Sequence, residues 1–171
     1  MGDNDILIEK ANELKNQEKF EESLKILEEL YNKFPNSEKI KKELIDTLFS
    51  YGGYLNDEYV LEYKKAKSNF KRITEIDPNN YRAHYNLGIA YFNLGQIEKA
   101  ERAYEEAIKI KPDYKHCHYN IGLIYEVKGD FEHALHQYEK ALKIDPNFTY
   151  ALHARNQVRN LLDEFKKTSA D

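Results

Sequence analysis

Apolar residues recur at helical spacing through most of the chain, most clearly between residues 84 and 112. Leu87, Tyr91 and Leu94 fall at i, i+4 and i+7, which places them on one stripe of a helix. A second stripe follows about one turn later and consists of Ala100, Ala103, Tyr104 and Ala107. Gly95 suits the turn between the stripes, and Pro112 ends the second one. The pattern predicts two amphipathic helices packed antiparallel.

The same pattern returns with a spacing of 34 residues. The stretch "HYNLGIAYFNLGQIEKAERAYEEAIKIKP" begins at His84, and "HYNIGLIYEVKGDFEHALHQYEKALKIDP" begins at His118. This repeat resembles the tetratricopeptide repeat, with its aromatic, Leu-Gly, Tyr, Ala, aromatic, Ala and closing Pro. His84 and His118 stand in place of the usual Trp. The resemblance implies an all-α fold, a right-handed α-solenoid of antiparallel helix pairs with about nine helices.

Repeat boundaries follow from the prolines that close each unit. We expect a degenerate first repeat at 4–37, regular repeats at 81–114 and 115–148, and a capping helix at 149–166, all in one domain. The first repeat has its stripe at Leu7, Ala11, Leu14, Ser23, Leu27 and Leu30. The capping helix has its stripe at Ala151, Ala154, Val158, Leu161, Leu162 and Phe165, with Arg155 and Asn156 where the repeats have Leu-Gly.

The second unit, 38–80, is about nine residues too long, and the surplus lies near 52–60. Gly52 aligns with the turn glycine Gly95, so we expect the first helix to end at about Tyr51. Asn56 and Asp57 are good capping residues, which predicts that the second helix begins there, about one turn longer than its counterparts. Its stripe consists of Tyr59, Tyr63, Ala66 and Phe70.

Two interpretations of this insertion stay open. In one, it is a tolerated loop whose tyrosines pack on the extended helix. In the other, it is an exposed aromatic surface that meets a partner or a second copy of the chain. The residues of this secondary interface are Tyr51, Tyr54, Leu55 and Tyr59.

Composition limits the classes of partner. Charged residues make up 33% of the 171 residues, and no run is long and apolar enough to span a membrane. The net charge of −4 gives no field that attracts nucleic acid, and the basic run from Lys64 to Arg72 reads as a solvated helix face. The single cysteine, Cys117, cannot form an internal disulfide, which favours a reducing, cytoplasmic setting. We expect neither nucleic acid nor membrane as a partner.

Catalytic chemistry has no motif here, so we expect no enzyme and no cofactor. A phosphate loop, a nucleophile elbow and His-Glu-x-x-His are all absent from the sequence. His116 and His118 point to different sides of one helix and should not share a metal ion, so we expect no metal site. Cys117 lies within a helix, where a small packing role is expected.

In tetratricopeptide arrays the first helix of each pair lines a concave groove, and such arrays are usually peptide-binding scaffolds or co-chaperone modules. The resemblance therefore implies a groove here, lined by Arg82, Tyr85, Asn86, Ile89, Asn93, His116, Tyr119, Asn120 and Leu123. Tyrosines offer flat apolar contacts, and asparagines offer both a donor and an acceptor to a peptide main chain. The alternative is that these residues are common choices in such repeats and bind nothing.

One subtype of the family clamps the C-terminal carboxylate of heat-shock chaperones with lysine, arginine and asparagine. Starting at the first repeat, the corresponding positions hold Ile8, Asn12, Glu43, Arg82 and Asn86; starting at the second, they hold Lys42, Asp46, Asn86, His116 and Asn120. Neither set forms a cationic clamp, and each contains an acid that repels a carboxylate. We expect no binding of this type.

The sequence thus favours a noncatalytic scaffold that binds a peptide segment of another protein in the groove. A self-associating assembly unit, forming a weak homo-oligomer through the insertion or the capping helix, is one alternative. A regulatory repeat segment of a larger enzyme or co-chaperone is another.

Overall fold

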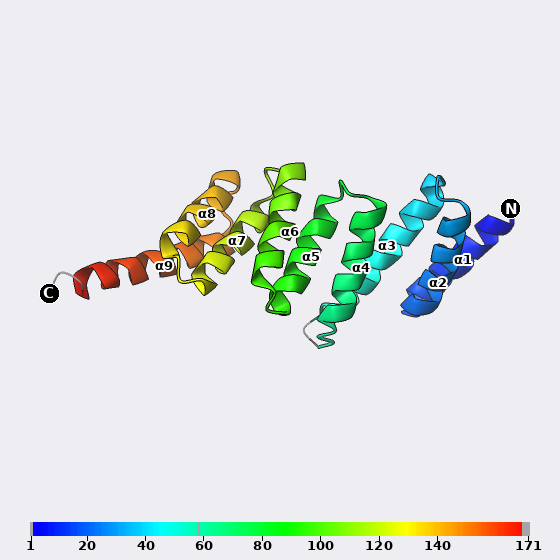
Figure 1. Ribbon diagram of the computed structural model, residues 1–171, viewed down its shortest axis with the longest axis horizontal. Coiled ribbons are helices and arrows are strands. Elements are labelled where there is room, and N and C mark those ends of the chain that lie inside the picture. The colour runs from blue at the N-terminus through cyan, green and yellow to red at the C-terminus, as the bar shows by residue number, and fades with distance from the viewer. Residues whose placement is uncertain (1, 58, 169–171) are drawn as a thin grey trace.

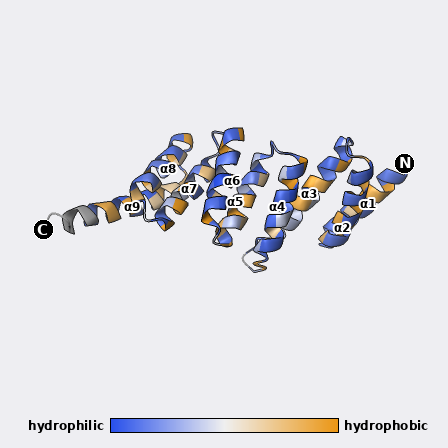
Figure 2. Cartoon of the chain, in the orientation of Figure 1, coloured by the Kyte–Doolittle hydropathy of each residue, from blue (hydrophilic) through white to orange (hydrophobic). Residues whose placement is uncertain are grey.

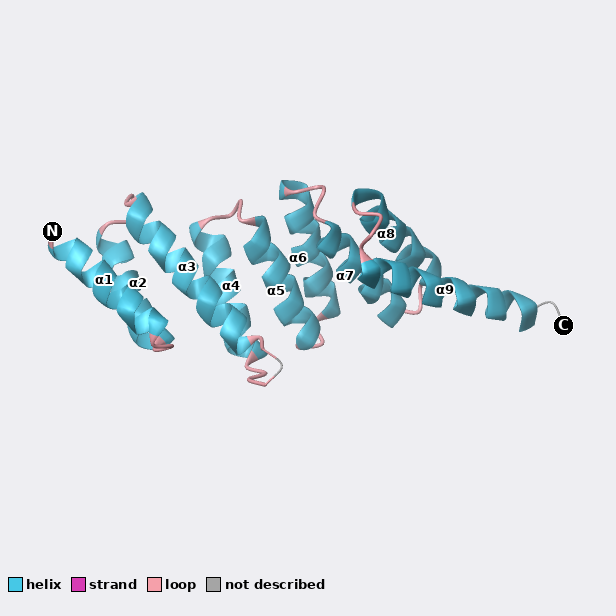
Figure 3. Cartoon of the chain, turned by 180° about the vertical axis from the view of Figure 1, so that it is seen from behind, coloured by secondary structure: helices cyan, strands magenta, loops and turns pink. Residues whose placement is uncertain are grey.

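The computed structural model describes residues 2–57 and 59–168, and side chains as far as residue 164. Within these ranges the regular elements are nine helices, with no strand (Figure 3). They stack side by side in chain order, with the termini at opposite ends (Figure 1). The helices are α1 (Asp3–Asn16), α2 (Phe20–Lys33), α3 (Glu38–Leu55), α4 (Tyr63–Ile76), α5 (Tyr81–Asn93), α6 (Ile97–Ile110), α7 (Lys115–Val127), α8 (Phe131–Ile144) and α9 (Thr149–Thr168).

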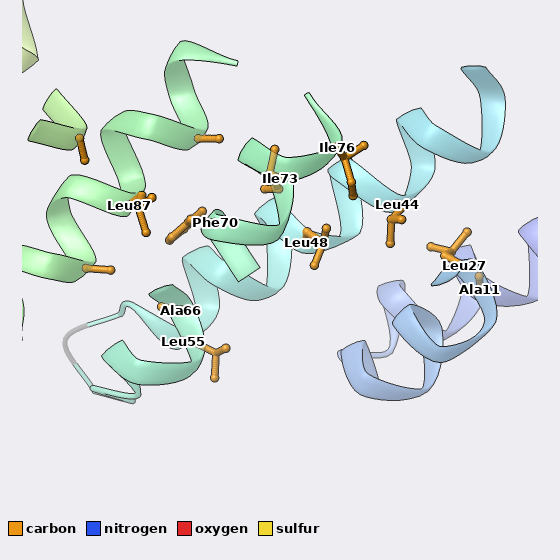
Figure 4. Packing of buried hydrophobic residues seen from close by; sticks show 13 residues of the cluster. Ala11, Leu27, Leu44, Leu48, Leu55, Ala66, Phe70, Ile73, Ile76 and Leu87 are labelled. Carbon is orange, nitrogen blue, oxygen red and sulfur yellow. The ribbon is translucent and has the colours of Figure 1, made fainter. Parts of the chain in front are cut away.

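Each pair packs through one apolar face, because the helices are amphipathic. Figure 2 shows apolar and polar residues on different sides of the helices. The first core cluster runs through the first two pairs and reaches α5 (Figure 4). It includes Ala11, Leu27, Leu44, Leu48, Leu55, Ala66, Phe70, Ile73, Ile76 and Leu87. Further clusters continue the core through the later pairs to α9, so the expected all-α solenoid is confirmed.

Small residues allow the two helices of a pair to approach closely. A Cβ added at Gly88 would overlap the ring of Tyr104, and one added at Gly122 would overlap the ring of Tyr138. In the first pair, Ser23 Oγ donates a hydrogen bond of 2.7 Å to the carbonyl oxygen of Ala11. Here Ile8 is buried, whereas Leu7, which we placed on the stripe, is 39% exposed.

The second pair differs from our prediction. Helix α3 does not end at Tyr51 but continues to Leu55, and α4 begins at Tyr63 rather than at Asn56 or Asp57. Helix α4 has 14 residues, the same as α2, α6 and α8, so the insertion lengthens the first helix and the loop but not the second helix. That loop extends beyond the turns of the neighbouring pairs (Figure 1).

Gly52 explains the error. It lies inside α3 and is buried, and a Cβ at this position would come within 2.7 Å of the Phe70 ring. Gly52 is therefore the counterpart of the close-approach glycine Gly88, not of the turn glycine Gly95. Tyr59, which we placed on the stripe of the second helix, precedes α4 and is 87% exposed.

Candidate functional site

The first helices of the last two pairs, together with α9, bring the predicted groove residues onto one surface. Tyr85 of α5 contacts His116 of α7, with ring centroids 6.1 Å apart. Tyr119 of α7 contacts Tyr150 of α9 at 6.0 Å. We call this surface of α5, α7 and α9 the groove face.

Aromatic rings run along the groove face without a break, and we call them the aromatic ladder. Tyr85 meets Tyr114 edge-on at 5.1 Å, and Tyr114 meets His116 at 5.3 Å. His116 lies 5.1 Å from Phe148, which in turn packs against the rings of α9. Edge-on and tilted contacts of this kind stabilise an aromatic cluster beyond the area that it buries. The members of the ladder are Tyr81, Tyr85, Tyr114, His116, Tyr119, Phe148 and Tyr150.

Two buried tyrosines from the second helices support the ladder from below. Tyr104 lies 5.9 Å from Tyr85, and Tyr138 lies 5.8 Å from Tyr119. The Tyr138 hydroxyl donates a hydrogen bond to the carboxylate of Glu126. Burial raises the pKa of both supporting tyrosines, so both stay protonated at neutral pH.

Asn120 lies between the ladder and its support. Burial raises the pKa of Tyr85 to about 12 and also raises that of Tyr104, while the nearby Asn120 amide acts on both hydroxyls in the opposite direction. Asn86 is half-buried, and its Nδ2 donates a hydrogen bond of 2.8 Å to the carbonyl oxygen of Arg82 in its own helix. Both amides therefore already interact with groups of the protein. A role in holding a peptide main chain stays a prediction for each.

His116 is half-buried within the ladder. Burial, with the neighbouring Lys115, lowers its pKa below the ordinary value of 6.5, so the imidazole is neutral at pH 7. His118, predicted to take the place of the usual Trp, is also half-buried. Its Nε2 lies 3.3 Å from the carbonyl oxygen of Pro112, and the His84 Nε2 lies 2.9 Å from that of Pro78. The two histidines thus link each first helix to the proline that precedes it.

A hollow of about 420 Å³ opens beside the ladder, between α7 and α9. From α7 it is lined by Tyr119, Leu123 and Glu126, all predicted for the groove except Glu126. From α9 it is lined by Thr149, Tyr150, His153, Ala154 and Gln157, which sequence reasoning missed. The signal was present, because Tyr150, His153 and Gln157 follow His116, Tyr119 and Leu123 at the spacing of 34 residues. We had assigned the segment only a capping role.

The other end of the solenoid has a different surface. Lys39 of α3 pairs with Asp5 of α1 at 2.6 Å, and Lys15 of α1 pairs with Asp46 of α3 at 2.5 Å. These ion pairs join neighbouring first helices, and within each pair the lysine and the aspartate neutralise each other's charge. Of the other predicted groove residues, Ile89 is half-buried and Asn93 is exposed at the end of α5.

The tyrosines of the insertion divide into packed and free residues. Tyr51 stacks on Phe20 with ring centroids 5.1 Å apart, and its hydroxyl donates a hydrogen bond of 2.7 Å to the carboxylate of Glu21. Leu55 is only 3% exposed, so it belongs to the core and not to an interface. Tyr54 and Tyr59 are 45% and 87% exposed. Of the predicted secondary interface, these two residues form the free surface.

Other chemistry finds little support in the described residues. Among them, no group of three or more His, Cys, Asp or Glu side chains is placed to hold a metal ion. Cys117 is fully buried, and burial raises its pKa to about 12, which suits packing rather than nucleophilic attack. In the basic run of α4, Arg72 is committed to a two-bond contact with Glu28 at 2.8 and 2.9 Å. As far as the structure describes the chain, no helix is long and apolar enough to cross a membrane.

Comparison with known proteins identifies the repeats. Residues 81–114 and 117–148 match the family model of the tetratricopeptide repeat. Among curated proteins, no sequence match is found. The solved structure of MamA superimposes with a TM-score of 0.70 at 23% identity, over 96% of this chain and 86% of that one.

Two further solved structures are similar. The TPR domain of Sgt2 from Aspergillus fumigatus gives a TM-score of 0.66 at 26% identity, over 72% of this chain and 82% of that one. The first TPR of Spaghetti (RPAP3), bound to the HSP90 peptide SRMEEVD, gives a TM-score of 0.64 at 22% identity, over 70% of this chain and 93% of that one. The predicted tetratricopeptide-repeat fold is confirmed.

Proposed function

We propose that this tetratricopeptide-repeat chain is a noncatalytic scaffold that holds a segment of another protein against its groove face. The observation that carries the proposal is the apolar surface beside the hollow. Tyr150, which lines the hollow, is 65% exposed, and Val127 and Leu161, one helical turn beyond the lining residues Leu123 and Gln157, are 63% and 39% exposed. Exposed apolar side chains gathered along a hollow are typical of protein interaction sites.

The fold supports protein binding as the general function. A similar solved structure, the first TPR of Spaghetti (RPAP3), holds a peptide of HSP90. We do not extend that ligand to this chain, because neither register of clamp positions holds the full set of cations and each contains an acid. A cytoplasmic setting remains our prediction, and it rests on the single cysteine.

Self-association is the second candidate function, and the exposure of Tyr54 and Tyr59 favours it. A Tyr59→Ala variant separates this candidate from the first. If the insertion joins copies of the chain, light scattering at high protein concentration will show an oligomer that the variant loses. A monomer for both proteins would exclude this candidate.

The test of the groove uses surface positions, so that the fold is preserved. A photo-reactive residue at Gln157, which is exposed in the hollow, is introduced into the chain and illuminated in an extract of the source cells. We expect one partner protein to be cross-linked, and mass spectrometry to map the contact to one segment. The cross-link should be lost with Tyr150→Ala combined with Val127→Ser.

A matched control makes similar changes elsewhere. Tyr59→Ala combined with Ile144→Ala also removes exposed apolar surface, but at positions outside the groove face. The proposal requires that this control still cross-links. Equal cross-linking by the wild type and the groove variant would refute it.

A further inference from the structure

Two cations flank one tyrosine at the start of the aromatic ladder. Arg82 lies over the Tyr81 ring at 6.0 Å, and its Nε donates 3.3 Å to the Tyr81 hydroxyl. The Nζ of Lys111, from the end of α6, lies 4.9 Å from the centre of the same ring and 5.9 Å from that of Tyr114. Both cations are thus held at the groove face by aromatic contacts.

These cations have no acidic partner, unlike similar cations nearby. In residues 2–57 and 59–164, the ion pairs include neither Arg82 nor Lys111. Lys115 also lies over a ring, 4.8 Å from the centre of Phe148, but it pairs with Asp145 at 2.5 Å. The two cations near Tyr81 therefore have no carboxylate partner, whereas Lys115 in the next repeat has one.

The repeat register shows where the acid is missing. Lys111 occupies the position that Asp77 holds in the second unit and Asp145 holds in the fourth, at a spacing of 34 residues. At this position the third unit alone has a cation instead of a carboxylate. A carboxylate from a bound protein would restore the balance that Asp145 supplies to Lys115.

The cations are continuous with the apolar hollow. The path leads from Tyr81 to Tyr114 at 5.1 Å, then through His116 to Phe148 at 5.3 and 5.1 Å, and on to Tyr150 at 5.7 Å. An extended segment advances about 3.3 Å per residue, so a segment of about seven residues spans the whole path. Of the hollow's lining residues, only Glu126 is acidic, and it accepts the Tyr138 hydroxyl bond.

We propose that the groove face takes an acidic and apolar protein segment, with a side-chain carboxylate between Arg82 and Lys111 and an apolar side chain in the hollow of Tyr119 and Tyr150. This inference rests on the function proposed above and adds the chemistry of the partner. Carboxylate bonds to arginine and lysine are charge-assisted and stronger than neutral ones. The apolar contact supplies affinity, and the carboxylate fixes the direction of the segment.

The test selects binders from a library of random peptides of about twelve residues, long enough for the ladder. We expect the recovered peptides to combine Asp or Glu with Leu, Phe or Trp at a fixed separation. Because the chain has no tryptophan, a single Trp in a synthetic copy reports binding by fluorescence. Replacing its acidic residues by the corresponding amides should weaken binding about tenfold.

Variants of the chain distinguish the proposed groove function from the proposed acidic segment. Arg82→Gln with Lys111→Gln should remove the tenfold preference for the acidic peptide and leave binding of the amide peptide unchanged. The control, Lys64→Gln with Arg102→Gln, removes the same charge from exposed positions on α4 and α6 and should keep the preference. Tyr150→Ala with Val127→Ser should weaken the binding of both the acidic and the amide peptide.

Each remaining outcome counts against a proposal. Binders that depend on Tyr150 and Val127 but carry basic or uncharged residues would overturn the acidic segment and leave the groove function standing. The same holds if Arg82→Gln with Lys111→Gln leaves the preference intact. If no selected peptide depends on Tyr150 and Val127, both proposals fail.

Discussion

At Gly88 and Gly122 the first helix of a pair lies directly against a buried ring of the second. Tyr104 is 2% exposed and Tyr138 is fully buried, so neither ring has space into which it can move. The hydroxyl of Tyr138 is also tied to Glu126. The distance between the two helices of a pair is thus set by the absence of one carbon atom.

We predict that Gly88→Ala destabilises the protein by about 1–3 kcal/mol, because the added methyl group overpacks the contact with Tyr104. Gly53→Ala is the matched control, since Gly53 also lies in a helix but a Cβ there meets nothing within 4 Å. The control should raise stability by roughly 0.5–1 kcal/mol, as alanine loses less conformational entropy. Urea unfolding followed by circular dichroism measures both changes, and equal effects would contradict the close approach.

The buried Cys117 thiol and Tyr85 hydroxyl keep their protons in the folded chain, which predicts that stability falls at alkaline pH. Burial raises the pKa of Cys117 from 9.0 to about 12 and that of Tyr85 from 10.0 to about 12. Above pH 9 the unfolded chain releases these protons and the folded chain retains them, so the free energy of unfolding falls as pH rises. Urea unfolding between pH 8 and pH 11 checks this. Cys117→Ala should move the onset from about pH 9 to about pH 10; a flat profile would show that these groups ionise freely.

Turns reveal a second conformational constraint, at the scale of the helix pair. Gly95 and Gly129 follow α5 and α7 with φ of 69° and 75°, where glycine is favoured. Glu18 occupies the equivalent turn after α1 with φ of 59°, although it has a side chain. The first pair therefore carries a strain that the third and fourth pairs avoid.

We predict that Glu18→Gly stabilises the protein by up to about 1 kcal/mol, because a non-glycine residue in this region costs roughly 1–2 kcal/mol. Part of the gain is offset by the greater freedom of glycine in the unfolded chain. Glu18→Ala keeps the strain and should leave stability nearly unchanged, which controls for loss of the carboxylate. Thermal unfolding measures all three proteins. Equal melting temperatures for Glu18→Gly and Glu18→Ala would contradict the prediction.

The helix pairs were readable from sequence where spacing alone determines them. The 34-residue period located the pairs of the third and fourth units, because stripe, turn glycine and proline all agree there. It misplaced the insertion, since a glycine marks either a turn or a close approach, and only the partner ring distinguishes the two. Counting back from Phe70 does not find Gly52 either, because Gly88 precedes Tyr104 by 16 residues whereas Gly52 precedes Phe70 by 18.

Across the whole molecule, the surface at α1 and α3 differs from the groove face of α5, α7 and α9. At α1 and α3, ion pairs join Asp5 with Lys39 and Lys15 with Asp46. At α7 and α9 the hollow combines apolar side chains, among them the exposed Tyr150, with the polar His153 and Gln157. Sequence spacing singled out residues of α5 and α7 and also reaches Tyr150, His153 and Gln157 of α9, but treating α9 only as a cap left these out; that α9 packs beside α7 to line a hollow is known only from the structure.

This division predicts how the chain responds to the peptide SRMEEVD, which the first TPR of Spaghetti (RPAP3) holds in its solved structure. Of the clamp positions counted from the first repeat, Ile8 is 4% exposed and apolar, and Glu43 would repel a carboxylate. Counted from the second repeat, the clamp meets Asp46, which is bound to Lys15. We therefore expect no binding that depends on the peptide's C-terminal carboxylate.

Isothermal titration of SRMEEVD and of its C-terminal amide measures this directly, with the Spaghetti domain as the positive control. The control should bind the free acid and lose affinity for the amide. This chain should give the same heat with both peptides, because Arg82 and Lys111, the cations of the proposed acidic subsite, lie at the aromatic ladder and not around a chain end. A clear preference for the free acid would mean that other groups replace the missing clamp, and the acidic segment proposed above would then have to be reassigned to a C-terminal tail.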